Sequence, residues 1–326
     1  MSALVLKASK KETKVLVFGG NGWIGSKVVE LLQDLKQKSK TNNTNIIVIK
    51  SLCRADDIKM IQKEIDLIKN VTHIMSFIGR THGIYNNEVI GTIDYLEKPG
   101  KLVENINDNL FSPIGLAELS KKNGIHFTYL GTGCIFEYDD KHLFGDAETG
   151  FLEGDLPNFV GSSYSIVKGY TDRLMQLLYS DSTLNARIRM PITDELCSSR
   201  NFITKITSYK KVCSMPNSMT VLDELLPVLI DMALNKQVGT VNLTNPGLIS
   251  HNEILSMYKE IVDPEFTWEN FTIEEQNQIL SSKRSNNCLD TMKLTNITLS
   301  FKNSVSPIKE AIRNVLLRMK DKKDNK

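Results

Sequence analysis

The chain of 326 residues lacks long apolar runs, paired cysteines and a large net charge. No apolar stretch approaches the roughly 20 residues that a membrane-spanning helix needs, and the run at residues 3–6 is too short for a secretory signal peptide. The five cysteines are scattered without a Cys-x-x-Cys pair, which argues against a disulfide framework and a zinc site. These absences predict a reduced, cytoplasmic protein without a metal ion or a membrane segment.

The charges nearly cancel, since 40 basic and 38 acidic residues leave a net charge of +2. No basic stripe stands out, so the sequence offers no electrostatic argument for nucleic-acid binding. Hydrophobic residues make up 41% and charged residues 24% of the chain, an ordinary globular composition with ample length for a large core.

Short apolar runs alternate with segments of helical spacing through the first 190 residues. The predicted strands are residues 14–18, 46–49, 71–78, 126–130 and 184–190. The predicted helices are residues 23–38, a segment that Asp56 or Asp57 caps, 101–123 with a kink at Pro113, and 162–179. Residues 80–100 and 137–160 are expected to be loops. The alternation predicts an α/β fold of Rossmann type, a doubly wound parallel sheet.

After Pro191 the alternation of strands and helices gives way to shorter elements. Ser250-x-x-Glu253 and Thr272-x-x-Glu275 match capping boxes, and Pro307 suits the start of a last helix. We expect a smaller C-terminal substrate-binding lobe here. The expected division is a flexible leader (1–13), an NADP-binding Rossmann domain (14–191), a substrate-binding lobe (192–318) and a disordered tail (319–326).

A glycine-rich turn follows the first predicted strand and opens the first helix. Its glycines, Gly19, Gly22 and Gly25, allow a tight turn and let the backbone approach a pyrophosphate at the helix N-terminus. The turn predicts a dinucleotide site; the alternative is a turn that only packs helix on strand. The expected cofactor contacts in the turn are Gly19, Asn21, Gly22, Trp23, Ile24 and Gly25.

The residues after the second strand indicate which dinucleotide is preferred. NAD-preferring folds usually place an acid there, but this chain reads Lys50-Ser51-Leu52-Cys53-Arg54 with no acid before Asp56. Arg54, helped by Lys50, suits a 2′-phosphate, although a solvated surface arginine is the plainer interpretation. We expect NADPH, with NADH as a weaker substitute, and Gly79 as a further cofactor contact.

Three side chains suit hydride transfer to a ketone. Tyr164 and Lys168 are four apart on a predicted helix and share a face, so the ammonium is expected to lower the pKa of the phenol, which acts as a proton donor. Both are also expected to contact the cofactor. Thr132, at a strand end, can hydrogen-bond the same ketone oxygen. Cys134 points to the same side if the strand continues, and its thiol suits proton removal beside the ketone; the plainer interpretation is a small buried residue.

The glycine turn, Thr132 and Tyr164-x-x-x-Lys168 together resemble the extended short-chain dehydrogenase/reductase superfamily. Longer segments closely resemble the bifunctional 3,5-epimerase/4-reductase of the nucleotide-rhamnose synthase family, which occurs in plants and amoeba-infecting giant viruses. These segments are residues 131–138, 157–162, 189–192, 200–205, 216–227, 244–247, 250–255 and 284–287. Residues 74–100 depart from the plant pattern, and His82 among them is expected to be a loop residue.

The resemblance implies roles for matching residues. Thr132, Tyr164 and Lys168 would serve hydride transfer, Cys134 would be the epimerising base, and Lys205 its partner acid. The implied reaction is 3,5-epimerisation of UDP-4-keto-6-deoxy-D-glucose and NADPH-dependent reduction at C4, giving UDP-L-rhamnose. We further expect Asn201 to position the substrate and Arg284 to contact a phosphate.

The resemblance also sets expectations about partners. A separate 4,6-dehydratase would supply the substrate, superfamily habit suggests a homodimer, and a viral source would place the protein in the host cytoplasm. Two alternatives stay open: a reductase acting on an already epimerised 4-keto sugar, and a non-catalytic NADP-binding regulatory subunit. Members of the second kind tend to lose the Tyr or the Lys, and this chain keeps both.

Overall fold

The fold is built around a six-stranded parallel sheet, seen in a computed structural model that describes residues 11–38, 44–197, 199–301 and 304–325. The strands lie in the order β11-β7-β6-β3-β1-β2 and every neighbouring pair is parallel. Their bounds are β1 Lys11–Phe18, β2 Thr44–Lys50, β3 His73–Ser76, β6 His126–Thr132, β7 Thr183–Ile188 and β11 Gly239–Asn242. The predicted doubly wound Rossmann sheet is confirmed.

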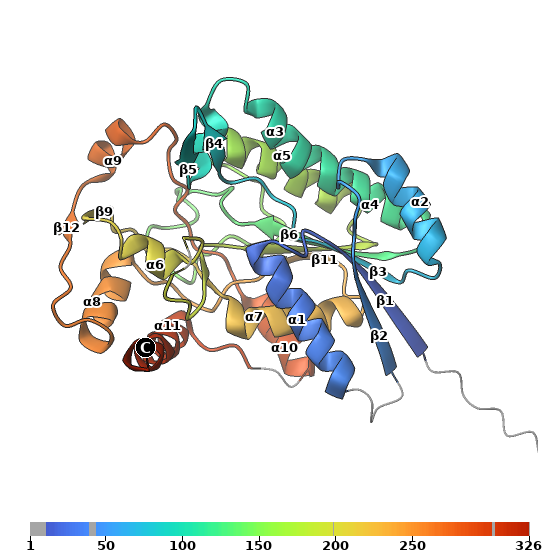
Figure 1. Cartoon of the computed structure of the whole chain (residues 1–326). Helices are drawn as coiled ribbons and strands as arrows, with labels where there is room; N and C mark the ends of the chain where they lie inside the picture. The colour runs from blue at the N-terminus through green and yellow to red at the C-terminus, as the bar shows by residue number, and fades with distance from the viewer. Residues whose placement is uncertain (1–10, 39–43, 198, 302–303, 326) are drawn as a thin grey trace, which may run out of the picture.

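Helices cover both faces of this sheet (Figure 1). Alternation along β1 shows why: Val15 and Val17 pack into one hydrophobic cluster, whereas Leu16 and Phe18 pack into another on the opposite face. The helices of the first face are α1 Trp23–Lys38, α7 Leu222–Leu234 and α10 Met292–Phe301. Those of the second face include α2 Ile58–Ile68, α4 Ser112–Lys122 and α5 Ser163–Leu178.

The region expected to be an irregular loop, residues 80–100, contains a β-hairpin instead. Strands β4 (Gly83–Tyr85) and β5 (Glu88–Ile90) are antiparallel, and a 3₁₀ helix, η2 (Ile93–Glu97), follows them. The hairpin turns through Asn86 and Asn87, which both have positive φ, at 50° and 65°. Asparagine tolerates this conformation well, so the Asn-Asn pair was the missed signal.

The predicted helix at residues 101–123 is interrupted where the proline was expected to act. Helix α3 (Leu102–Ile106) passes into a π-helical turn, η3 (Asn107–Phe111), before α4 begins. Pro113 has no N–H to donate to the carbonyl of Asn109. Thr171 of α5 satisfies that carbonyl, donating its hydroxyl at 2.6 Å, so the widened turn is tied to the neighbouring helix.

Other segments of the C-terminal half form a third hydrophobic cluster with helices of their own. Both predicted capping boxes are present, Ser250 with Glu253 and Thr272 with Glu275. The small strands are β8 Pro191–Ile192, β9 Lys211–Val212, β10 Thr220–Val221 and β12 Glu269–Asn270. The helices are α6 Phe202–Ile206, α8 His251–Ile261, α9 Ile273–Ile279 and α11 Ile308–Asp324.

The structure corrects the expected boundaries at three places. After residue 191 the chain returns to the large sheet, because β11 pairs with β7 and α7 packs beneath it. The expected tail is helical as far as Asp324, since α11 buries Met319. Strand β1 begins at Lys11, inside the expected leader; residues 1–10 and 326 lie outside the described part.

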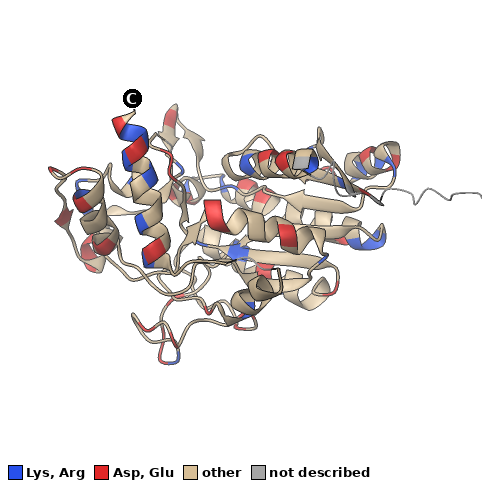
Figure 2. Ribbon diagram, turned by 90° about the horizontal axis from the view of Figure 1, so that it is seen from below, with Lys and Arg blue, Asp and Glu red and all other residues tan. Residues whose placement is uncertain are grey.

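The outer surface carries both signs of charge. Figure 2 shows acidic and basic residues interspersed along the outer helices. Among the residues that the structure describes, no helix combines the length and the apolar character needed to span a bilayer.

Candidate active site

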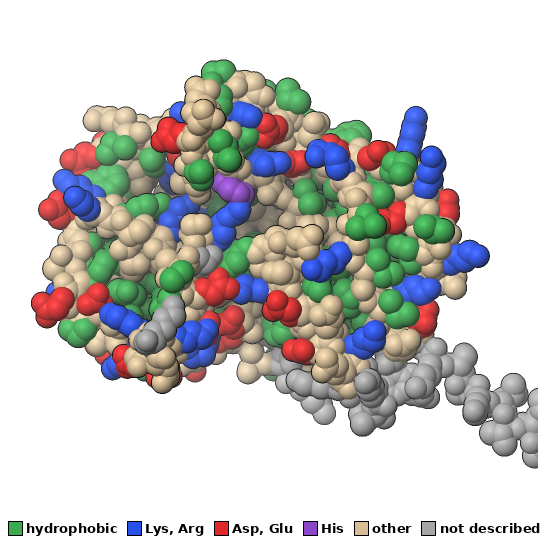
Figure 3. Space-filling view, viewed as in Figure 1, with side chains coloured by type: hydrophobic (Ala, Val, Ile, Leu, Met, Phe, Trp, Pro, Cys, Tyr) green, Lys and Arg blue, Asp and Glu red, His purple; other side chains and the backbone are tan. Residues whose placement is uncertain are grey.

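A large cavity of about 1150 Å³ lies at the carboxyl ends of the parallel strands. It is lined by residues at or just after the ends of β1, β3, β6 and β7, and by segments of the C-terminal half. This edge is where ligands bind in open α/β sheets. Figure 3 shows a hollow on this side of the molecule with basic side chains and one histidine around it.

The glycine turn forms one wall of the cavity. Gly19 has φ +73°, and its carbonyl accepts the Gly22 N–H at 2.9 Å. A Cβ on Gly25 would come within 2.1 Å of that carbonyl, so helix α1 can approach the turn only with glycine there. The turn thus leaves the N-terminus of α1 open to the cavity. The lining residues of the turn are Gly19, Gly22, Trp23, Ile24 and Gly25.

Arg54 lies at the rim of the same wall with a side chain that is 75% exposed. Its guanidinium donates to both carboxylate oxygens of Asp56, at 3.0 and 2.8 Å. The pair raises the pKa of Arg54 and lowers that of Asp56. Lys50, the expected helper, donates to the side-chain oxygen of Asn21 at 2.9 Å. An ion pair as exposed as that of Arg54 is weak, so the Asp56 carboxylate can be replaced by an anion that binds the guanidinium more strongly.

Thr132 and Tyr164 lie together deeper in the cavity. Thr132 is the last residue of β6 and Tyr164 is in the first turn of α5, and both are buried but line the cavity. Burial raises the pKa of Tyr164, and the charge of Cys134 adds to this, while a hydrogen bond with Thr132 opposes it. The phenol is therefore held in its protonated form.

Lys168 has a different partner from the one expected. Its ammonium donates to the hydroxyl of buried Tyr129 on β6, at 2.7 Å. Burial lowers the pKa of Lys168 to about 7, against the opposing charges of Asp108 and Cys134. The predicted lowering of the Tyr164 pKa by Lys168 is wrong for this structure, because burial raises the pKa of the phenol and the opposing hydrogen bond is that with Thr132. Lys168 and Gly79, both predicted cofactor contacts, line the cavity.

Cys134 lies beside Thr132 on the cavity wall. Strand β6 ends at Thr132, so side-chain alternation does not place the cysteine; a turn does. The backbone N–H of Cys134 donates to the hydroxyl oxygen of Thr132 at 3.1 Å. The hydroxyl proton of Thr132 is then available to an acceptor in the cavity.

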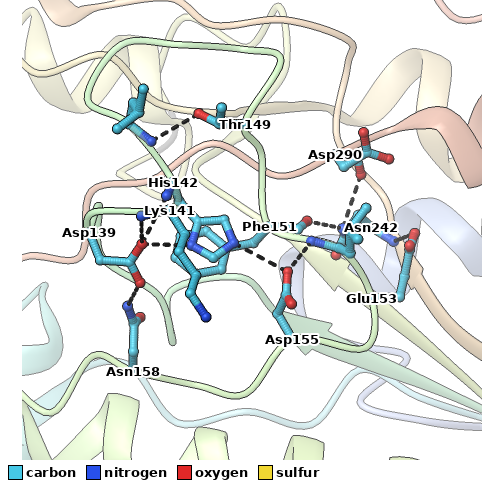
Figure 4. A network of polar contacts seen from close by, with 12 residues as sticks. Asp139, Lys141, His142, Thr149, Phe151, Glu153, Asp155, Asn158, Asn242 and Asp290 are labelled. Carbon is cyan, nitrogen blue, oxygen red and sulfur yellow. Dashed lines mark hydrogen bonds and ion pairs between the residues drawn. The ribbon is translucent and has the colours of Figure 1, made fainter.

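The loop after Cys134 is held by the long acidic loop at 137–160. The N–H groups of Asn158 and Phe159 donate to the carbonyl of Ile135, at 3.2 and 3.1 Å. Figure 4 shows how this loop is tied: His142 lies between Asp139 and Asp155, with ring nitrogens 2.8 and 3.4 Å from their carboxylates. The His142 ring also stacks on a phenylalanine of the loop, with 3.6 Å between centroids.

Lys205 enters the cavity from helix α6, on the C-terminal side. Its ammonium donates to the carbonyl of Gly91 at 3.0 Å. Burial lowers the pKa of Lys205, and the charges of Arg284 and Arg200 lower it further, while Asp94 opposes them. The structure thus brings Lys205 to the same cavity as Cys134 and Tyr164.

Arg284 and Asp94 form a half-buried ion pair at this end of the cavity, with 2.5 Å between nitrogen and oxygen. Although burial opposes the change, hydrogen bonds from Arg284 and Thr92 lower the pKa of Asp94 to about 2. The expected phosphate contact, Arg284, does line the cavity, but its charge is largely satisfied by this carboxylate.

His82 is a loop residue, as expected, between β3 and β4. It also lines the cavity, with its ring against the guanidinium of Arg200. Burial lowers its pKa, and Arg200 adds to the effect. Asn201 is wrong as a substrate contact: it is fully buried, and its amide donates to the carbonyls of Thr193 and Glu195, both at 2.9 Å. It holds the turn before α6 and so positions Lys205 indirectly.

The sequence assigned no role to three residues near this site. Tyr129 belongs to no motif, and Arg200 lies in the family-like segment 200–205 without a role of its own, because the roles of both depend on what packs against them. His82 was seen but not connected to Arg200, which lies 118 residues further along the chain. In the described residues, no group of His, Cys, Asp and Glu has the arrangement of a metal site.

A glycine turn at a helix N-terminus, with Thr132, Tyr164 and Lys168 at the same sheet edge, defines a dinucleotide-dependent enzyme of the short-chain dehydrogenase/reductase type. The chain belongs to the NAD dependent epimerase/dehydratase family, whose sequence profile matches residues 15–202. The fold and the sheet order are those expected of such a protein.

Relatives of higher sequence identity indicate which members of the family this chain resembles. A crystal structure of the L780 UDP-rhamnose synthase from Acanthamoeba polyphaga mimivirus matches with a TM-score of 0.84 and 51% identity, covering 94% of this chain and 100% of that one. The bifunctional dTDP-4-dehydrorhamnose 3,5-epimerase/dTDP-4-dehydrorhamnose reductase of Arabidopsis thaliana is 40% identical over 88% of both chains. A trifunctional 4,6-dehydratase/3,5-epimerase/reductase of the same plant is 41% identical over 87% of this chain, which spans 39% of that protein.

Proposed function

We propose that this protein epimerises UDP-4-keto-6-deoxy-D-glucose at C3 and C5 and then reduces the C4 ketone with NADPH, giving UDP-L-rhamnose. The observation that carries the proposal is that a thiol and an ammonium face one cavity together with the Thr132 and Tyr164 pair. A reductase without epimerase activity would need only Thr132, Tyr164 and Lys168. The names of the mimivirus and plant relatives support the same pair of activities.

Epimerisation begins with the acidity that the C4 ketone gives to hydrogens at C3 and C5. The thiolate of Cys134 takes one proton, and the electron pair moves onto the ketone oxygen as an enolate. The hydroxyls of Thr132 and Tyr164 stabilise this oxygen. Lys205 then returns a proton to the other face of the carbon, which inverts it. A lowered pKa makes Lys205 a better proton donor near neutrality.

Reduction uses the same oxygen. NADPH held along the glycine turn would supply the hydride. Glycine at position 25 lets helix α1 approach this turn closely, so the helix N-terminus would face the pyrophosphate. Tyr164 protonates the oxygen as C4 is reduced, and its raised pKa keeps that proton in place beforehand. Arg54, exposed at the rim, is the proposed contact of the 2′-phosphate; Asn21, Gly79 and Lys168 are proposed cofactor contacts, with NADH as a weaker substitute.

A separate 4,6-dehydratase is the proposed source of the substrate, as the plant relative that joins the three activities in one chain suggests. We also propose that the protein acts in the cytoplasm, where its five free cysteines would stay reduced.

A homodimer is proposed through α3 and α5, which lie side by side and expose Val103, Phe111 of the adjoining turn and Tyr170. The same face of a second copy would cover these side chains.

Incubation with the 4-keto sugar nucleotide and NADPH in heavy water tests the proposal. We expect rhamnose carrying deuterium at C3 and C5, with one NADPH oxidised for each product. A reduced sugar without deuterium would leave a reductase only. Folded protein that binds NADPH but oxidises none would instead indicate a regulatory subunit.

A further inference from the structure

Tyr129 is a buried tyrosine behind the cavity wall that the reaction scheme above does not use. It lies on β6, three residues before Thr132, and is 1% exposed. Its hydroxyl accepts a hydrogen bond from the ammonium of Lys168 at 2.7 Å. Lys168 lines the cavity, whereas Tyr129 does not. The contact therefore reaches the ammonium from the side of the protein core.

Packing alone does not account for a hydroxyl at this position. Phe127, two residues earlier on β6, is buried in the same hydrophobic cluster with a side chain that has no polar atom. The Lys168 ammonium lies 5.0 Å from the centroid of the Tyr129 ring, a contact that phenylalanine would keep. What tyrosine adds is an oxygen among apolar side chains, which costs free energy unless it is hydrogen-bonded. Lys168 is the partner that satisfies this oxygen.

The partner of the ammonium is a hydroxyl where a carboxylate would be the usual choice. Among the described residues, Lys168 has no ion-pair partner, and the Tyr129 hydroxyl is the only hydrogen-bond partner of its ammonium. Asp108 of η3 is the acid whose charge most favours the ammonium, but its carboxylate pairs with Arg80 at 2.8 Å. One of the three N–H donors of the ammonium is thus used in the core, which leaves two for a ligand in the cavity.

A hydroxyl can hold this nitrogen in either protonation state. Burial lowers the pKa of Lys168 to about 7, against the opposing charges of Asp108 and Cys134, so both forms exist near neutrality. Burial also raises the pKa of Tyr129, which therefore keeps its proton. The hydroxyl can accept from the ammonium or donate to the free amine. The nitrogen can thus stay in one place while its charge changes.

That place is the part of the wall proposed to contact the cofactor. A Cβ on Gly79, shortly after β3, would lie 3.6 Å from the Lys168 nitrogen. Gly79 lines the cavity, and so does Tyr164, one turn before Lys168 on α5. The Tyr129 hydroxyl therefore fixes the lysine nitrogen beside Gly79, at the wall that Tyr164 shares.

We propose that Tyr129 is a positioning residue for reduction: its hydroxyl holds the nitrogen of Lys168 at the cavity wall, beside Gly79, where the lysine contacts NADPH. Its role in reduction rests on the proposed function. Epimerisation as proposed above does not involve Lys168, so Tyr129 should matter for reduction and not for the inversion of C3 and C5.

Tyr129→Phe tests this role, because it removes the hydroxyl and keeps the ring. Tyr179→Phe is the matched control: Tyr179 is buried in the same cluster and donates its hydroxyl to Glu118 at 3.2 Å, outside the cavity lining. Lys168→Met, alone and combined with Tyr129→Phe, completes a double-mutant cycle. The measurements are NADPH affinity by calorimetry, NADPH oxidation with an already epimerised 4-keto sugar, and deuterium entry at C3 and C5 without NADPH. Thermal melting verifies folding.

We expect Tyr129→Phe to weaken NADPH binding and to lower kcat for reduction, each by about tenfold, the usual size of a lost hydrogen bond to a charged group. Deuterium entry at C3 and C5 should stay at the wild-type rate. In the Lys168→Met background, Tyr129→Phe should not weaken NADPH binding further, because the group through which the hydroxyl acts is gone. Tyr179→Phe should match the wild type in all three measurements.

Wild-type NADPH affinity and kcat in folded Tyr129→Phe would overturn the proposal. An equal loss of affinity with and without Lys168 would also overturn it, since the hydroxyl would then act through packing alone. Equal losses of reduction and of deuterium entry would do the same, because the damage would be general. If the wild type binds NADPH but turns over no sugar, the proposed function fails, and the NADPH affinities of the cycle still decide whether Tyr129 positions Lys168.

Discussion

The two ends of the cavity are built in different ways. The cofactor end is made largely by the turn from Gly19 to Gly25, where backbone shape decides the geometry. The sugar end is made by side chains from distant segments: Cys134, Lys205, and the pair of Asp94 with Arg284, which lie 190 residues apart in the chain. A short motif can specify the first kind of site, whereas the second depends on the packing of the whole chain.

The largest effect is expected at the sugar end, from Cys134→Ala. Removing the base should lower deuterium entry at C3 and C5 by about 10² to 10⁴-fold, the usual contribution of a positioned acid or base. Reduction of an already epimerised 4-keto sugar should continue, because Thr132 and Tyr164 remain. Proton exchange followed by NMR measures the first and NADPH absorbance the second. Exposed Cys197→Ala is the control, and wild-type exchange in Cys134→Ala would contradict the assignment.

At the cofactor end, Gly25→Ala should act through the backbone. Its Cβ would lie 2.1 Å from the carbonyl of Gly19, so α1 must move, at a cost of about 1 to 3 kcal/mol or more in unfolding free energy. NADPH affinity, measured by calorimetry, should fall with it. Gly154→Ala, whose Cβ would meet no atom within 4 Å, should leave both values unchanged. Wild-type affinity in Gly25→Ala would mean that the turn does not hold the cofactor.

A pH effect should appear at the sugar end from Asp94. Its pKa of about 2 in the folded protein is below the ordinary 3.8, so its stabilisation is complete above about pH 4 and is lost as the pH falls towards 2. Allowing for partial solvent exposure, this contributes on the order of 1 to 2 kcal/mol. The unfolding free energy of Asp94→Asn should therefore vary less between pH 4 and pH 2 than that of the wild type. Identical slopes would contradict the pairing with Arg284.

The smallest effect is expected from Arg54→Ala at the rim of the cofactor end. The guanidinium is exposed and already forms an ion pair with Asp56. Its loss should therefore weaken NADPH binding by about tenfold, or about 1.4 kcal/mol, and leave NADH binding almost unchanged. The measurement is the ratio of kcat/KM for the two cofactors. Lys14→Ala, on the strand away from the turn, serves as a control. Equal loss for both cofactors would show that Arg54 does not read the 2′-phosphate.

Prediction from the sequence worked best where a local pattern carries the geometry. The glycine spacing, the capping boxes at Ser250 and Thr272, and the strand–helix alternation are all local, and all three appear in the structure. The Asn86–Asn87 turn was equally local and was overlooked. The prediction that Asn201 contacts the substrate was wrong for a different reason. Its segment does lie next to the site, but its amide hydrogen-bonds to the backbone within the protein.

The alternation of strands and helices, the turn at Gly19 and the shared helix face of Tyr164 and Lys168 could all be predicted from the sequence, because each follows from periodicity or from steric limits within a few residues. The contact of Lys168 with Tyr129, the pairing of Arg284 with Asp94 and the return of β11 to the sheet came only from the folded chain. Burial and charge pairing depend on which distant segments pack together, and that is a property of the whole folded chain.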